Sequence, residues 1–443
     1  MCDDRIHEID KEANINSILC YTNKMRKRKK KRKSNFILTF LLTFSLVTLI
    51  GVFCILAYVL LRENGSSAGK NPPAKEVISL VPEAVPVGDA LGEADGPEEE
   101  PSKYGALLAD EAYMAANNMY AKEAAEEEQV TIAFAGDILF DANYAVMATL
   151  LQKGGDIHNG IAPEVMEEMK SADIMMVNNE FAYSDGGAPL PEKQFTFRAK
   201  PSTVSYLADL GVDIVSLANN HSYDYGEQAL LDTLETLKGA GIPYVGAGVN
   251  EEEAMAPVYF IVNDMKIAFI SATQIERLDN PDTKGATETS PGVFRCWNGE
   301  KLMQKVAEAK AESDFVIVYV HWGTENQEET DWAQNKQAPE LVAAGADLII
   351  GDHPHILQKI EVIDGVPVIY SLGNFWFNSK EIDTGMVRIV LTKEGLQSYQ
   401  FIPCLQSHCR TTLLTGAEKE RVLAKMRAMS VGVEIDADGY VRW

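Results

Sequence analysis

From residue 129 onward, short apolar runs that end in polar side chains alternate with longer amphipathic segments. The runs have the length and apolar character of buried strands, and residues 226–241 and 298–313 repeat apolar positions at helical spacing. Strands that alternate with helices predict an α/β fold. The six strand-like runs are residues 130–137, 172–180, 212–221, 314–323, 346–355 and 366–375.

Polar residues gather where these runs end. A single polar residue after a strand is most often a helix cap or a turn, but four of the seven histidines lie at run ends, next to carboxylates and amides. Because α/β sheets bind ligands beyond the carboxyl ends of their strands, we predict one shared site at one sheet edge. The residues at the run ends are Asp137, Glu180, Asn220, His221, His321, His353, His355 and Asn374.

This mixture of side chains predicts a metal site. Carboxylate, amide oxygen and imidazole without thiolate suit Mn²⁺, Zn²⁺ or Fe²⁺, as one ion or two. Pro354 lies between two of the histidines and favours an extended backbone at the residue before it. The predicted ligands are Asp137 and Glu180, which supply charge, and the neutral side chains of Asn220, His321, His353 and His355.

Two neighbouring residues are candidates for catalysis. His221 could donate a proton to a leaving oxygen. Asp224 could orient His221 through its other ring nitrogen. Asp224 could equally cap the helix that begins near Gly226, and the sequence leaves both interpretations open.

Three further residues are candidates for substrate binding. Arg198 and Lys200, in "FTFRAKPS", could pair with carboxylate or phosphate groups. The alternative for both is a solvated loop. Asn374, at the end of the sixth run, could point into the site.

The N-terminal region predicts a membrane anchor. The basic block "KMRKRKKKRK" (24–33) precedes 26 residues without a charge, enough to span a bilayer. The positive-inside rule then places the tail in the cytoplasm and the body outside the membrane. The predicted parts are a tail (1–34), a transmembrane helix (35–61), an acidic linker (62–128), the α/β domain (129–400) and a C-terminal extension (401–443).

The composition argues against one class of binding partner. The formal net charge of −25 argues against nucleic acid, because binding there depends on neutralising phosphates. Cys296, Cys404 and Cys409 follow the predicted span, so a disulfide among them is an open alternative.

Several motifs follow one another along the chain, in the order "FAGDILFD", "VNNEFAYSDGG", "FTFRAKPS", "SLANNHSYDYGEQALLDTLETLKGAGIPYVGAG", "VYVHWGTE", "GADLIIGDHPHILQ" and "VIYSLGNFWF". Together they resemble the CapA family of capsule or poly-γ-glutamate synthesis proteins. The resemblance covers about residues 130–400. It implies the four-layer α/β/β/α sandwich of the metallo-dependent phosphatases. It also implies a role in making, exporting or attaching an anionic cell-surface polymer, with membrane polymer-synthase subunits as partners.

The resemblance also implies roles for single residues. Glu180 stands where the phosphatases have a bridging aspartate. Leu139 stands where they usually have a histidine, so one metal position loses a ligand. Asp137 resembles the first metal-binding aspartate, Asn220 and His221 the ligand and proton-donor pair, His321 the isolated histidine ligand, and His353 with His355 the closing histidine pair.

Three functions are compatible with these observations. The first is a surface metalloenzyme of capsule metabolism, hydrolase or phosphoesterase in type. The second is a non-catalytic subunit of a polymer synthase or export complex, whose cluster binds metal or polymer. The third is a phosphoesterase unrelated to capsule, and Leu139 weakens it.

Overall fold

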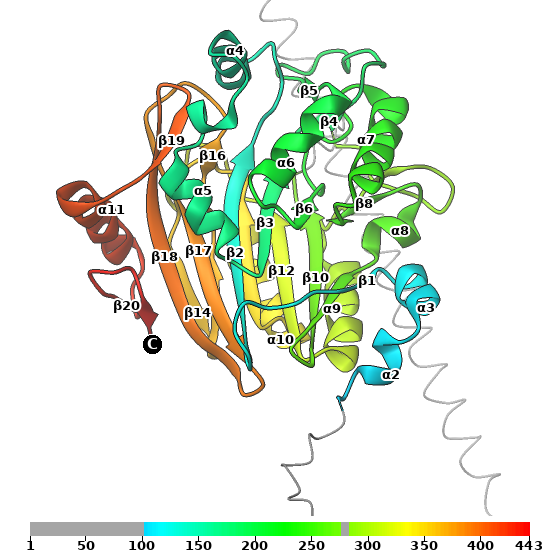
Figure 1. Cartoon of the computed structure of the whole chain (residues 1–443), viewed down its shortest axis with the longest axis vertical. Helices are drawn as coiled ribbons and strands as arrows, with labels where there is room; N and C mark the ends of the chain where they lie inside the picture. The colour runs from blue at the N-terminus through cyan, green and yellow to red at the C-terminus, as the bar shows by residue number, and fades with distance from the viewer. Residues whose placement is uncertain (1–101, 276–282) are drawn as a thin grey trace, which may run out of the picture. The chain divides into compact units, whose positions relative to one another are not determined.

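The computed structural model describes residues 102–275 and 283–443, which contain two large sheets (Figure 1). The seven-stranded sheet has the order β1 (Met119–Ala121), β9 (Val258–Val262), β10 (Met265–Thr273), β12 (Phe315–His321), β13 (Leu348–Asp352), β15 (Val366–Ile369) and β14 (Ile360–Ile363). The eight-stranded sheet has the order β19 (Arg410–Leu413), β18 (Gly395–Ser407), β17 (Ile382–Thr392), β2 (Gln129–Ile138), β3 (Ile174–Asn179), β6 (Ile214–Ser216) and β7 (Tyr244–Val245), with β16 (Asn374–Trp376) paired to β2.

Helices cover the outer faces of both sheets. Helices α4 (Ala145–Gln152), α5 (Pro163–Lys170), α6 (Ser205–Asp209) and α7 (Gly226–Ala240) pack on the eight-stranded sheet. Helices α9 (Glu300–Glu312) and α10 (Trp332–Ala344) pack on the seven-stranded sheet. The remaining elements are α2 (Gly105–Leu108), α3 (Glu111–Ala116), α8 (Glu251–Met255), α11 (Gly416–Met429), η1 (Ile157–Asn159), η2 (Pro201–Val204), and the short strand pairs β4 (Ala182–Tyr183) with β5 (Arg198–Ala199), β8 (Ala247–Gly248) with β11 (Gly292–Val293), and β20 (Glu434–Ile435) with β21 (Val441–Arg442).

The strands explain why both faces of each sheet are buried. Successive side chains of a strand point to opposite faces. In β2, Ile132 and Phe134 lie in the core between the sheets, whereas Ala133 and Ala135 face the helices. The mixed α/β class predicted from the sequence is therefore confirmed, and helices, sheet, sheet and helices follow one another in layers.

Most of the predicted strands form, with shorter bounds. The second run becomes β3, the third β6 and the fourth β12. The fifth run was predicted to reach residue 355, but β13 ends at Asp352 and the two histidines lie in the loop that follows. The sixth run splits into β15 and β16, which belong to different sheets.

The segments before and after the predicted domain also join the sheets. The alanine-rich segment 104–128 forms α2, α3 and the edge strand β1. At the other end, residue 400 lies inside β18, and α11 packs into the core between the sheets. The predicted tail and transmembrane helix lie outside the described residues and stay predictions. Within residues 102–275 and 283–443, no helix has the length and apolar character that a membrane span needs.

Topology brings the two sheets together at their carboxyl edges. Strands β2, β3 and β6 are parallel in one sheet, and β10, β12 and β13 are parallel in the other. The Tyr319 hydroxyl of β12 donates a hydrogen bond to the Ala135 carbonyl of β2 at 3.0 Å, which joins the sheets near these ends. The residues that follow the strands of both sheets can therefore share one site.

Candidate metal centre

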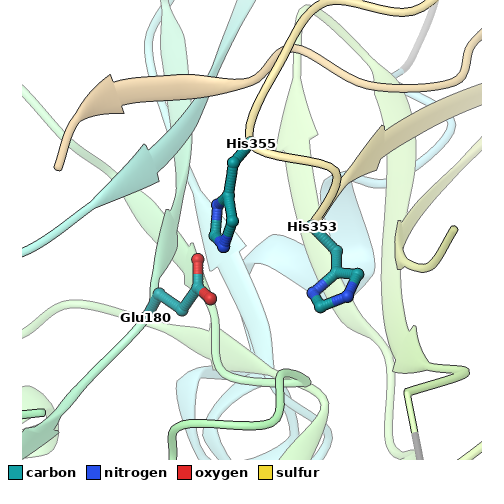
Figure 2. Close-up of side chains that lie close together, drawn as sticks. All are labelled: Glu180, His353 and His355. Carbon is teal, nitrogen blue, oxygen red and sulfur yellow. The ribbon is translucent and has the colours of Figure 1, made fainter. Parts of the chain in front are cut away.

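All six predicted metal ligands converge at this shared edge. Asp137 belongs to β2, Glu180 directly follows β3, Asn220 lies four residues after β6, and His321 ends β12. Two overlapping groups of three residues could each hold an ion, and both groups contain Glu180. Within each group, the potential ligand atoms lie within 4.8 Å of one another. In Figure 2, Glu180 and the two histidines of one group lie around a common centre. The groups are Asp137, Glu180 and His321, and Glu180, His353 and His355.

A partly buried hydrogen bond sets the charge of two ligands. His355 Nδ1 lies 3.0 Å from Asp137 Oδ2. Burial alone would raise the pKa of Asp137, but the hydrogen bond and positive charge of His355 hold it below its ordinary value. Burial likewise opposes the charge of His355, but the hydrogen bond and charge of Asp137 raise its pKa. The two side chains therefore favour a charged pair.

His321 has the arrangement expected of a neutral ligand. Its Nδ1 lies 2.8 Å from Asp352 Oδ1, and its Nε2 lies 2.8 Å from Asn220 Oδ1 and 3.0 Å from His353 Nδ1. Burial lowers the pKa of His321 to about 3. Burial also lowers the pKa of His353 well below its ordinary value, and the neighbouring His321 adds to that effect. Both rings are neutral at physiological pH, as metal binding requires.

Glu180 is buried with an oxygen that has no hydrogen-bond partner. Its Oε1 makes no hydrogen bond and lies 3.8 Å from both His221 Nε2 and His321 Nε2. Burial raises the pKa of Glu180 well above its ordinary value, and the nearby carboxylates of Asp137 and Asp352 raise it further. Such an orphaned acceptor in a protein interior requires an explanation, and an unseen ion is one.

His221 is oriented from behind by Asp224. The distance between His221 Nδ1 and Asp224 Oδ2 is 2.6 Å. Phe197 packs against the imidazole with ring centroids 4.1 Å apart. Burial lowers the pKa of His221, although Asp224 opposes the shift. The N-cap of α7 is Tyr225, and its side chain makes no capping hydrogen bond. The carboxylate of Asp224 contacts Lys193, Phe197 and His221, so Asp224 orients His221 and does not cap the helix.

Comparison with known proteins agrees with the motifs. The family model described as "Bacterial capsule synthesis protein PGA_cap" matches residues 131–379, more than half of the chain. The chain belongs to this family. The family resemblance predicted from the sequence is thereby confirmed.

Individual relatives carry related names. The PGA_cap chain is 31% identical over 285 residues to "PGA biosynthesis protein CapA" of Bacillus subtilis, which covers 62% of this chain and 72% of that protein. It is 29% identical over 314 residues to "Capsule biosynthesis protein CapA" of Bacillus anthracis, covering 68% and 74%. A solved structure of a 5'-nucleotidase from Candida albicans is 11% identical to this chain. The match covers 64% of this chain and 53% of the nucleotidase chain, and its TM-score is 0.34.

Three residues with clear structural roles in this PGA_cap protein were not predicted. Asn178 Nδ2 donates to Asp137 Oδ1 at 2.9 Å and lies 3.3 Å from Glu180 Oε2, so it links two predicted ligands. Asp352 orients His321, and Lys193 contacts Asp224 at 2.5 Å. The "NNE" and "GDH" motifs contained Asn178 and Asp352, but no local pattern marks Lys193.

The predicted substrate residues occupy different surroundings. Asn374 is buried beside the cluster, because it pairs with Asp137 across β2 and β16. The Arg198 guanidinium instead donates to the Gly186 carbonyl at 2.6 Å, and Lys200 is exposed just before η2. The roles of these residues in substrate binding stay predictions.

The backbone at the histidine pair differs from the expectation. Pro354 predicted an extended residue before it, but φ is 92° at His353 and 61° at His355. Non-glycine residues in this region cost on the order of 1–3 kcal/mol and persist where the surroundings enforce them. Here the ring contacts to His321 and Asp137 hold both residues in place.

Leu139 has apolar surroundings. Its side chain is fully buried in the core between the eight-stranded sheet and its helices. Its backbone N–H donates to the Trp376 carbonyl at 3.0 Å. An apolar side chain in this position supplies no ligand.

Proposed function

We propose that this PGA_cap family member is a membrane-anchored cell-surface protein of capsule biosynthesis, export or attachment, with a divalent-metal site. The polymer would be of the poly-γ-glutamate type. Membership of the family and the names of its relatives support the capsule role. The uncharged segment 36–61 behind a basic tail supports the anchor.

The unpartnered Glu180 Oε1 carries the proposal of a metal. Zinc bonds to nitrogen and oxygen ligands are about 2.0–2.2 Å long, so two ligands of one ion lie roughly 3–4 Å apart. The distance of 3.8 Å from Glu180 Oε1 to His321 Nε2 falls in that range. The donor set also fits, because it contains oxygen and nitrogen ligands without thiolate.

The residues of the site would have two separate roles, metal binding and proton donation. The ion would be held by Asp137, Glu180, Asn220, His321, His353 and His355. A bound divalent ion supplies Lewis-acid charge that polarises a phosphoryl or carbonyl oxygen. His221, held at Nδ1 by Asp224, would take up a second proton at Nε2 and donate it to a leaving oxygen. Because Leu139 supplies no ligand, a second ion would be held by fewer ligands than the first.

The first experiment measures bound metal. The full chain is purified, incubated with Mn²⁺, Zn²⁺ or Fe²⁺, and analysed by mass spectrometry of the elements. We expect about one or two equivalents in the wild type, and their loss in the double variant His353→Ala, His355→Ala. The matched control is His158→Ala, His408→Ala, because both of those histidines are exposed.

Two outcomes decide between the functions. If the wild type binds metal and the double variant does not, assays on phosphoesters and γ-glutamyl polymers follow, with His221→Gln as the inactive variant. The absence of metal in the wild type with every ion would overturn the metal site and leave a non-catalytic subunit as the leading function. Separately, membrane fractionation of the full chain and of a chain lacking residues 1–61 tests the anchor.

A further inference from the structure

The loop between β4 and β5 folds back over the turn that carries His221. In this loop, residues 184–197, the Leu190 N–H donates to the Asp224 carbonyl at 2.8 Å. At the end of the loop, the Arg198 guanidinium lies 4.3 Å from the centre of the Tyr225 ring. These contacts anchor the loop and deliver a lysine to the back of the candidate site.

Lys193 of this loop is an unusually buried cation. Its side chain is 6% exposed, and its Nζ lies 2.5 Å from Asp224 Oδ1, whose side chain is fully buried. The same ammonium also donates to the backbone carbonyl of Asn220. A single buried charge therefore contacts residues on both sides of His221.

The Asp224 carboxylate is shared between three donors. Oδ1 accepts from Lys193, while Oδ2 accepts from the Phe197 N–H at 2.7 Å and faces His221 Nδ1 at 2.6 Å. Hydrogen bonds between charged groups are stronger and more directional than neutral ones. Because Lys193 occupies Oδ1, the carboxylate is fixed with Oδ2 toward the ring. His221 Nδ1 then donates, and Nε2 faces Glu180.

We propose that Lys193 is a positioning residue that fixes the Asp224 carboxylate and the Asn220 carbonyl together, and thereby sets the orientation and the tautomer of His221. The proposal rests on the proposed function, because Asn220 and His221 are its ligand and its proton donor. A purely structural lysine would stabilise Asp224 without affecting the state of the His221 ring. The two roles can therefore be separated.

Nitrogen-15 spectra of the histidines test the proposal. The full chain is labelled with ¹⁵N-histidine and kept free of metal, and the His221 signals are assigned with His221→Gln. We expect a single ring state with the proton on Nδ1 in the wild type. Lys193→Met should lose that single state, and Lys193→Arg should restore it in part. Lys153→Met is the control, because Lys153 is exposed directly after α4 and has no role in the candidate site.

Folding is measured on the same samples. If Lys193→Met does not fold, Lys193→Gln replaces it and is held to the same outcomes, because glutamine removes the charge but keeps a donor. A folded variant without the ammonium whose His221 signals match the wild type overturns the proposal, even if its melting temperature is lower.

Metal affinity provides a second measurement. Loss of residues that orient metal ligands typically weakens binding by about 10–100-fold. We expect a loss of this size for Mn²⁺ or Zn²⁺ in Lys193→Met, measured by calorimetric titration, and none in Lys153→Met. A wild type that binds no metal contradicts the proposed function instead, and the spectra of the metal-free chain still decide the role of Lys193.

Discussion

Glu180 shows how a single residue can point to a ligand. A buried carboxylate is costly unless its oxygens are satisfied. Asn178 lies 3.3 Å from Oε2, but Oε1 has no hydrogen-bond partner. The residues around it differ in charge, because the pKa of His321 is lowered by burial and that of His355 is raised by Asp137. An added cation would satisfy the free oxygen.

Glu180→Gln tests this interpretation directly. The amide keeps the shape of the side chain but removes its charge, so we expect the metal affinity to fall by at least about 10–100-fold. Calorimetric titration with Mn²⁺ or Zn²⁺ measures the change. Glu167→Gln is the matched control, because Glu167 is exposed on α5. Equal affinities in wild type and Glu180→Gln would exclude Glu180 as a ligand.

The same residue predicts a pH dependence of the metal-free protein. Burial raises the pKa of Glu180 above its ordinary value of 4.5, so the folded state binds its proton more tightly than the unfolded state. Its contribution to stability is present below pH 4.5 and is lost as the pH rises through the folded-state pKa. Thermal melts in a chelator should therefore show Glu180→Gln gaining stability over the wild type from pH 5 to 8. A difference that does not change with pH would contradict this.

At the scale of elements, the predictions succeeded where the pattern is local. Helix α7 was predicted at 226–241 and forms at Gly226–Ala240, because its apolar positions repeat at helical spacing and Gly241 ends it with φ 69°. Strand β1 was missed, because it depends on pairing of Met119 with Tyr259, far away in the chain. Short strands of this kind leave no periodic signal.

For the candidate site, the sequence predicted the residues at strand ends but not those placed by tertiary contacts. The run-end rule located the six candidate ligands, because parallel strands present their carboxyl ends at one edge. It could not find Lys193, which reaches the site from a loop, or the left-handed backbone of His353, which depends on surrounding contacts. These features arise from tertiary packing and leave no spacing to recognise.

One glycine controls the approach of two elements at the site. A Cβ on Gly136 would lie 2.0 Å from the Gly373 carbonyl oxygen, which accepts the Asp137 N–H. Gly136→Ala must therefore push β2 away from the segment before β16. We expect a loss of about 1–3 kcal/mol in the free energy of unfolding, with weaker metal binding. Denaturant unfolding measures the first effect.

Gly239→Ala is the matched control for that substitution. Gly239 lies inside α7, and a Cβ there would meet no atom within 4 Å. Alanine favours helices over glycine by up to about 1 kcal/mol, so this variant should gain slightly in stability. Equal behaviour of the two variants would show that the close approach at Gly136 is unimportant.

At the scale of the whole described body, the segments at its two ends complete the sheets. Near the N-terminal end, Lys103 and Tyr104 hold Asp314 at 2.5 and 2.8 Å. Near the C-terminal end, β18 pairs along β17, and the fully buried Leu423 of α11 packs between the sheets. The region after residue 400 is therefore part of the fold, not an appendage to it.

A chain that ends at residue 400 should not fold. It would lose half of β18 and all of β19, and it would expose the core that α11 covers. We expect no cooperative transition in its thermal melt by circular dichroism. The milder variant Leu423→Ala should remain folded but lose about 2–5 kcal/mol. Val431→Ser, at a residue 86% exposed, should change stability by less than about 0.5 kcal/mol. A melt of the shortened chain that matches the full chain would instead place the domain boundary at residue 400.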